Sequence, residues 1–90
     1  MLTMLKTDLG ILTTTAYDAR LTQLLTAAEK AITAEGASTL DASDPLDQQL
    51  IVMYAAWLWR RRDNMEGMPR MLRWTLNNRI FSEKAGATDG

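Results

Sequence analysis

The sequence predicts an all-α fold, a compact bundle of about four helices: a short N-terminal helix, two longer central helices and a C-terminal helix. Apolar residues recur three and four positions apart in successive segments, which is the spacing of one helix face. Glycine and proline stand at the borders of these segments, where helices end and begin. The chain has 90 residues, which is enough for one domain with one core and too few for two.

The first segment predicts a short N-terminal helix. Leu2, Leu5, Leu9 and Leu12 would line one side of it. Gly10 is expected to end it, because glycine accepts the left-handed backbone that often follows a helix.

The second helix is expected to begin at a variant capping box made by Thr15 and Asp18. Glu35 and Gly36 are expected to close it. Between these ends the apolar residues form a stripe at helical period, made by Tyr17, Leu21, Leu24, Leu25, Ala28, Ala31 and Ile32.

Residues 36–44 are small and polar and predict a loop. Asp44 followed by Pro45 predicts the start of a third helix, which is expected to run to about Arg62. Its middle, residues 50–59, is apolar on every side, so it must be surrounded. Either the other helices of the chain or a neighbouring subunit provides that cover.

A turn follows, and Pro69 is expected to begin a fourth helix that ends near Phe81. The predicted organisation is therefore a single helical domain over residues 1–81 and a flexible C-terminal tail over residues 82–90. Met71 and Trp74 fall on a different side of the fourth helix from its buried line, which is made by Leu72, Leu76 and Ile80.

The composition excludes most enzyme chemistry. The chain contains no cysteine and no histidine, so it lacks a thiolate nucleophile, an imidazole base and the usual ligands of zinc. The glycines match neither a dinucleotide-binding nor a phosphate-binding loop. Asp41, Asp44 and Asp47 are carboxylates that Mg²⁺ accepts, but helix capping already explains their position. No enzymatic activity, cofactor or metal site is expected.

No membrane anchor is expected either. The longest apolar run, residues 50–59, is far shorter than the roughly 20 residues that cross a bilayer. The N-terminal segment does not resemble a secretory signal. The default expectation is an intracellular protein.

The net charge of −1 conceals an asymmetry. Residues 1–50 carry three basic and seven acidic groups, a balance of −4, whereas residues 51–90 carry seven basic and four acidic groups, a balance of +3. Such a chain could bind a polyanion through its basic half, or stack on copies of itself with acidic surface against basic surface. Simple solvation of both halves is the third interpretation.

All three tryptophans and five of the arginines fall between residues 57 and 74. Both residue types are enriched at the energetic centres of protein interfaces, and an arginine can stack on an indole or pair with a carboxylate. Alternatively, the tryptophans fill the chain's own core and the arginine run is a solvated helix end. The candidate residues of a subunit interface are Trp57, Trp59, Arg60, Arg61, Arg62, Arg70, Arg73, Trp74 and Arg79.

Sequence-specific DNA binding is the alternative function. A helix, a short turn and a second, basic helix are typical of a helix-turn-helix, whose arginines would contact phosphates or bases. The pI of about 5.2 is low for a free-standing duplex binder. In addition, Trp74 and Leu76 beside Arg73 place bulky apolar groups where a recognition helix normally presents polar ones.

The segments together resemble the small head–tail connector, or head-completion adaptor, proteins of tailed bacteriophages and prophages. The resemblance covers most of the chain, including "AYDARLTQLLTAAEKAI", a long helix from near Asp-Pro to "MYAAWLWRRRDN", and the closing "MPRMLRWTLNNRIF". The positions that match the family's pattern are Trp59, Arg62, Pro69, Leu72 and Arg79.

The resemblance implies a structural protein that forms a homo-oligomeric ring, possibly twelvefold in the particle. The implied partners are the portal protein, tail-side connector or stopper proteins, and duplex DNA as a non-specific passenger through the lumen. The implied location is the head–tail junction of the virion, and the bacterial host cytoplasm before assembly. The family's C-terminal arm reaches the portal, but only about nine residues follow the predicted last helix here, so no portal-contacting residue is assigned.

Overall fold

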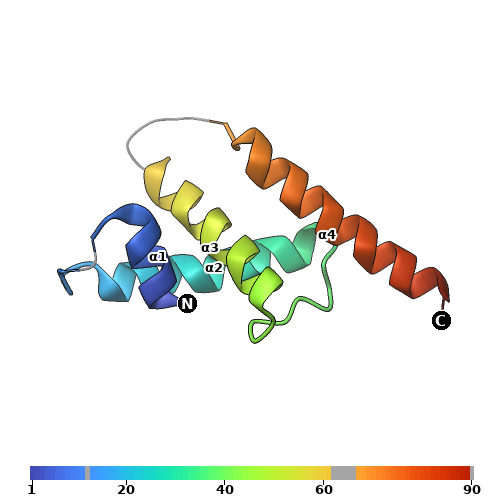
Figure 1. The fold of residues 1–90 in the computed structure, drawn as a ribbon, viewed down its shortest axis with the longest axis horizontal. Helices are drawn as coiled ribbons and strands as arrows, with labels where there is room; N and C mark the ends of the chain where they lie inside the picture. Colours follow the sequence, from blue (N-terminus) through green and yellow to red (C-terminus); the bar gives the residue numbers. More distant parts are fainter. Residues whose placement is uncertain (12, 62–66, 90) are drawn as a thin grey trace.

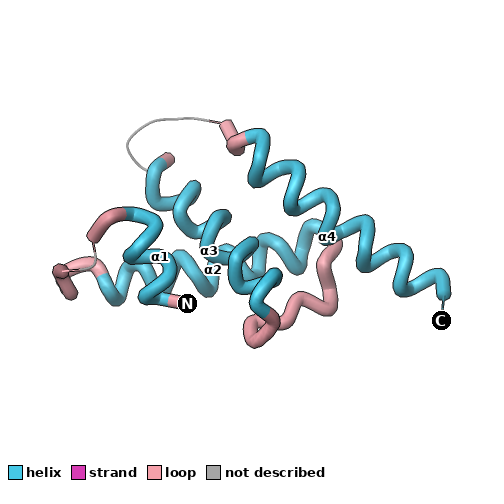
Figure 2. The backbone as a smooth tube through the Cα atoms, in the orientation of Figure 1, coloured by secondary structure: helices cyan, strands magenta, loops and turns pink. Residues whose placement is uncertain are grey.

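The computed structural model describes residues 1–11, 13–61 and 67–89. These residues form four α-helices and no strand. The helices are α1 Leu2–Leu9, α2 Asp18–Glu35, α3 Pro45–Arg60 and α4 Arg70–Asp89. α1, α2 and α3 lie close together, and α4 lies along one side of them with its last turns projecting away (Figure 1). The described residues between the helices are loops and turns (Figure 2), and the predicted all-α, four-helix fold is confirmed.

Glycine ends both α1 and α2, as predicted. The backbone of Gly10 has φ of 74° and that of Gly36 has φ of 140°. In each case the N–H groups of the glycine and of the next residue donate to carbonyls in the last helical turn. Side chains with a Cβ rarely adopt such φ values, so glycine allows these helices to end with their carbonyls satisfied.

The predicted capping box of α2 is wrong. Tyr17 occupies the N-cap position without a side-chain cap, and Thr15 contributes only its backbone carbonyl, which accepts from the N–H of Asp18. The carboxylate of Asp18 instead pairs with the ammonium of Lys6 at 2.9 Å. Lys6 is buried. A buried ammonium without a counter-charge costs more free energy than a helix start without a side-chain cap. Asp18 therefore fastens α2 to α1.

The predicted start of α3 is confirmed. Asp44 is the N-cap, its carboxylate accepts from the N–H of Asp47 at 3.4 Å, and Pro45 is the first helical residue. α3 ends at Arg60, and the end expected near Arg62 falls outside the described residues.

The core lies mainly between α2 and α3. Its buried residues are Leu5, Leu21, Leu24, Leu25, Ala28, Ile32, Ala37, Leu50, Ile51, Val52, Tyr54, Ala55, Ala56, Leu72 and Leu76. The chain's own helices thus bury much of the apolar run over residues 50–59, whereas Met53, Trp57, Leu58 and Trp59 within it remain partly exposed. The chain's own helices cover the buried residues in the middle of α3, and Met53 remains open to solvent in part.

α4 runs antiparallel to α3. Arg79 pairs with Asp47 in the first turn of α3, while Leu72 lies beside Trp57 and Arg60 near the end of α3. Leu72 and Leu76 are buried, and Ile80 packs against the core, so the predicted inward line of this helix is confirmed.

The end predicted for the fourth helix near Phe81 is wrong, because α4 continues to Asp89. The segment expected as a tail therefore extends the helix. Arg79 and Glu83 form an ion pair four residues apart, at 3.0 Å, which supports the helix across the expected boundary. Contacts from the loop before α3 to Glu83 hold the same turn in place.

Candidate protein-binding surface

α4 has an inward side and an outward side, and large apolar residues lie on both. Leu72 and Leu76 point into the core. Trp74 and Phe81 are seven residues apart, which is two helical turns, so they share another side of the helix. Met71, three residues before Trp74, lies near that side as well.

The fold leaves these outward residues uncovered. The exposed fraction is 64% for Met71, 63% for Trp74 and 74% for Phe81, and Leu46 in the first turn of α3 is 75% exposed. Together with the partly exposed Met53, these four residues define what we call the α3–α4 face. Single exposed apolar residues are ordinary, whereas a group of large ones on one face indicates an interaction site.

A groove of about 570 Å³ runs between α3 and α4 within this face. Its apolar lining comes from Leu46, Leu50 and Met53 on α3 and from Met71 and Trp74 on α4. The rest of the lining is Gln49, Thr75, Asn78 and Ser82, which are uncharged, and the mutually paired Asp47 and Arg79. Flexible methionines adapt readily to a partner's shape, so the groove suits an apolar side chain of another protein.

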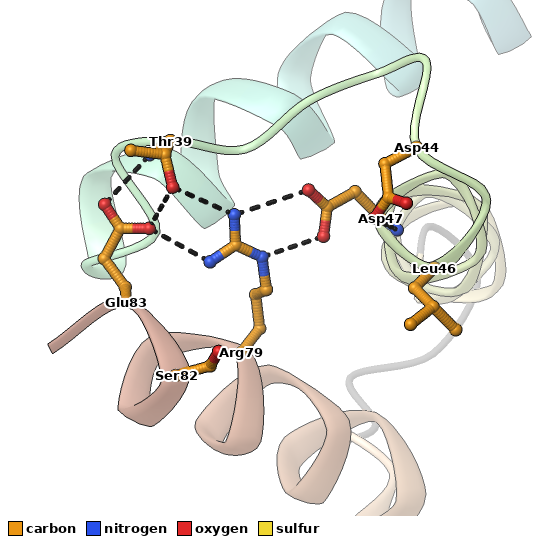
Figure 3. Close-up of a pocket in the computed structure, with 7 residues that line it drawn as sticks. All are labelled: Thr39, Asp44, Leu46, Asp47, Arg79, Ser82 and Glu83. Carbon is orange, nitrogen blue, oxygen red and sulfur yellow. Dashed lines mark hydrogen bonds and ion pairs between the residues drawn. The ribbon is translucent and has the colours of Figure 1, made fainter. Parts of the chain in front are cut away.

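Asp47 and Arg79, which line the groove, belong to a polar cluster that Figure 3 shows. The guanidinium of Arg79 donates to both carboxylate oxygens of Asp47, at 2.8 and 3.4 Å, to Glu83 at 3.0 Å and to the hydroxyl of Thr39 at 3.2 Å. Glu83 also accepts from the hydroxyl of Ser38 at 2.6 Å, from the N–H of Thr39 at 3.1 Å and from the hydroxyl of Thr39. The cluster thereby joins the loop before α3, α3 itself and α4.

These contacts change the proton affinity of the cluster. Hydrogen bonds from Ser38 and Thr39, together with the one from Arg79, lower the pKa of Glu83 to about 2. The hydrogen bond to Asp47 raises the pKa of Arg79. Both groups therefore stay charged at neutral pH, and each stabilises the other's charge.

Two of the predicted interface tryptophans pack within the chain. Trp57 makes an edge-to-face contact with Tyr54, with ring centroids 5.4 Å apart, and Trp59 makes one with Tyr17 at 5.2 Å. The guanidinium of Arg61 lies 4.9 Å from the centre of the Trp57 ring, a cation–π contact. Both indoles are half-buried, so among the predicted tryptophans Trp74 is the one that faces outward.

The predicted interface arginines fall into two groups: Arg79 lies in the polar cluster, and the other described ones lie where α3 ends and α4 begins. Arg60 pairs with Asp8 at 3.3 Å, Arg73 lies 3.9 Å from Glu35, and Arg79 belongs to the polar cluster. Arg70 is exposed at the start of α4. Arg62 lies outside the described residues.

The sequence prediction missed several residues that shape this surface. Leu46 and Phe81 were not assigned to it, although both fall outside the buried lines of their helices. Glu83 was placed in a flexible tail, and its spacing of four from Arg79 was the one available signal of its role. Ser38 and Thr39 gave no signal, since their contact with Glu83 spans more than forty residues.

No group of three or more acidic residues among the described residues is placed to hold a metal ion. None of the described helices is both long enough and apolar enough to cross a lipid bilayer. Comparison of the chain with protein-family models, with curated proteins and with solved structures found no match.

Proposed function

We propose that this chain is a structural assembly protein that binds other protein subunits through the α3–α4 face, in the role of a phage or prophage head–tail connector. The exposure of Leu46, Met71 and Trp74 around one groove carries the proposal, and Phe81 is exposed two helical turns from Trp74 on the same side of α4. Covering one such side chain contributes about 1–2 kcal/mol to an interface. Tryptophan, methionine and arginine are also the residue types that are enriched at the centres of protein interfaces.

In this role, copies of the chain would assemble as a ring beneath the portal protein, with tail-side proteins below and duplex DNA passing through the lumen. The positions that carry the family resemblance support the scaffold: Leu72 is in the core, Trp59 packs on Tyr17, and Arg79 fixes α4 to α3. The α3–α4 face would then meet a different protein of the particle, the portal or a tail-side protein, and other surfaces would join the copies of the ring.

Deleting the coding sequence from the phage or lysogen that carries it tests the proposal. We expect heads and tails that form separately and fail to join, and we expect mass spectrometry to find this chain in intact particles. Complementation with Trp74→Ala should fail, whereas Arg20→Ala, which changes an exposed residue of α2, should restore joining. Infectious tailed particles made without the gene would contradict the connector role.

A small DNA-binding regulator is the second candidate, and the arginines where α3 ends and α4 begins favour it. Arg60, Arg61, Arg70 and Arg73 are all exposed there. Against it, residues 61–69 separate the two helices, whereas a helix-turn-helix connects them with three or four residues. The outward side of α4 is also apolar. Duplex binding measured across a salt series decides between the two, and sequence-selective binding near physiological salt would favour the regulator.

A further inference from the structure

We infer that two free copies of this chain pair through their α3–α4 faces about a two-fold axis, with the α4 helices antiparallel. The inference concerns the protein before it meets any other partner. It goes beyond the proposed function, because it depends on the face alone and not on a role in the virion.

The distribution of apolar surface selects a second α3–α4 face as the occupant. Four of the six exposed large hydrophobic residues among the described residues belong to this face. The other two, Met4 and Tyr17, are less exposed and lie in α1 and before α2. A head-to-tail contact would therefore set the apolar face against a largely polar surface and leave it unmatched. Only the same face of another copy offers comparable apolar area.

The distribution of charge selects the antiparallel orientation. Where α3 ends and α4 begins, the described residues include four arginines and two carboxylates: Arg60, Arg61, Arg70 and Arg73 against Asp8 and Glu35. Residues 62–66 of the sequence add one arginine and two carboxylates, so the balance at this end is +1. Where α3 begins, four carboxylates stand against two cations: Asp41, Asp44, Asp47 and Glu83 against Arg79 and Lys84. A two-fold axis through the middle of the face brings the basic end of each copy to the acidic end of the other. A parallel arrangement would oppose like charges.

The shape of the face supports the same pairing. Trp74 lies toward the basic end of the groove and Leu46 toward its acidic end. The two-fold axis places Trp74 of each copy against Leu46 and Phe81 of the other. Asn78, midway along the outward side of α4, then lies near the axis and close to Asn78 of the second copy.

The size of the face predicts a weak dimer. On α4 the face runs from Met71 to Phe81, so it is about 16 Å long and about 20 Å wide across two helices, or roughly 300 Å² per copy. Stable interfaces bury about 800 Å² per partner, so we expect a weak dimer with a dissociation constant toward the upper end of the micromolar range. Such a pair would keep the apolar face covered and still release it to a tighter-binding partner.

Single-cysteine cross-linking tests the two-fold geometry, since the natural chain has no cysteine. Asn78→Cys should give a covalent dimer on mild oxidation or with a short bismaleimide, because a residue near a two-fold axis lies beside its own copy, whereas a head-to-tail contact pairs different residues. Gln23→Cys, at an exposed polar position on α2, is the matched control and should stay uncross-linked. Circular dichroism verifies that both variants keep the helical fold.

Sedimentation equilibrium supplies the second measurement. The wild type should reach a dimer at high micromolar concentration, and Trp74→Ala should weaken pairing by about 10-fold or more. Any one of three results would overturn the inference. These are equal cross-linking at residues 23 and 78, a larger closed assembly in which residue 78 does not link to itself, and a dissociation constant above about 1 mM. None of these results bears on whether heads and tails join without the gene, so the two proposals fail separately.

Discussion

The guanidinium of Arg79 joins parts of the chain that are far apart in sequence. It bridges Asp47 in α3, Glu83 in α4 and Thr39 in the preceding loop. Its side chain is 20% exposed and that of Asp47 only 6%. Loss of the guanidinium would leave a carboxylate nearly buried without its counter-charge, which is costly.

We therefore expect Arg79→Ala to lower the free energy of unfolding by about 1–3 kcal/mol, measured by urea denaturation. Arg70→Ala is the control, because Arg70 is exposed on the same helix, and its effect should stay within about 0.5 kcal/mol. Equal effects of the two substitutions would show that the cluster does not hold α4.

Glu83 makes the stability of the fold sensitive to acid. Its folded-state pKa of about 2 lies below the ordinary value of 4.5, so its contribution is complete above about pH 4.5 and is lost as the pH falls toward 2. Thermal unfolding of the wild type and of Glu83→Gln should differ most above that range and converge below it. A difference in melting temperature that stays constant from pH 7 to pH 2 would contradict the role assigned to this carboxylate.

Trp74 and Leu76 are two residues apart on α4 and are predicted to behave oppositely. Leu76 is fully buried, so Leu76→Ala should cost about 2–5 kcal/mol of stability. Trp74→Ala should change the stability of the dilute monomer by less than about 1 kcal/mol, because that indole is largely exposed. Chemical denaturation at low protein concentration measures both. A large loss for Trp74→Ala would mean that the indole supports the fold.

At the scale of elements, the end of α2 is fixed against α4. A Cβ built on Gly36 would lie 3.0 Å from Cγ2 of Ile80, whereas one on Gly10 meets nothing within 4 Å. Both glycines have positive φ, so either substitution by alanine strains the backbone by about 1–2 kcal/mol.

Gly36→Ala should therefore be more destabilising than Gly10→Ala in thermal denaturation, and the excess reports the contact between α2 and α4. Ile80→Ala removes both γ carbons that the new methyl group would meet, so Gly36→Ala should cost less stability in the Ile80→Ala background than in the wild type. If the two glycine substitutions cost the same, α4 does not pack closely on the end of α2.

The helix ends that local chemistry determines were predictable. Gly10, Gly36 and the Asp44–Pro45 pair each fix a terminus through their own backbone or side chain, and the structure confirms all three. The start of α2 and the end of α4 were not predictable in the same way. The side chain of Asp18 could either cap α2 or pair with Lys6, and local sequence does not decide between the two. α4 continues past Phe81, where Glu83 contacts a loop that is distant in sequence.

The candidate surface was predictable in part for a similar reason. The period of α4 placed Trp74 away from the buried line, and the structure leaves it exposed. α3 is apolar all round, so its pattern could not say which sides of Trp57 and Trp59 face inward. Arg79 belonged to the predicted interface, but its partner Asp47 is 32 positions earlier, and composition alone gives no sign of that pairing.

At the scale of the whole molecule, three helices build a core and the fourth adds a surface. α1, α2 and α3 bury most of the apolar residues, and α4 uses one side to complete that core and another to form the α3–α4 face. Among the described residues, basic groups gather where α3 ends and α4 begins, and acidic groups gather where α3 begins. We propose that the protein acts by binding other proteins through the α3–α4 face.

The claim that protein covers the α3–α4 face is tested most directly by hydroxyl-radical footprinting of Trp74 and Phe81, read by mass spectrometry. Dilute protein is compared with protein at high micromolar concentration and with intact particles that contain it. We predict that both side chains are oxidised readily in the dilute protein and protected in the other two states, while Tyr17 reacts equally in concentrated and dilute protein. The account would be contradicted if Trp74 and Phe81 were oxidised as readily in the particle and in the concentrated protein as in the dilute protein.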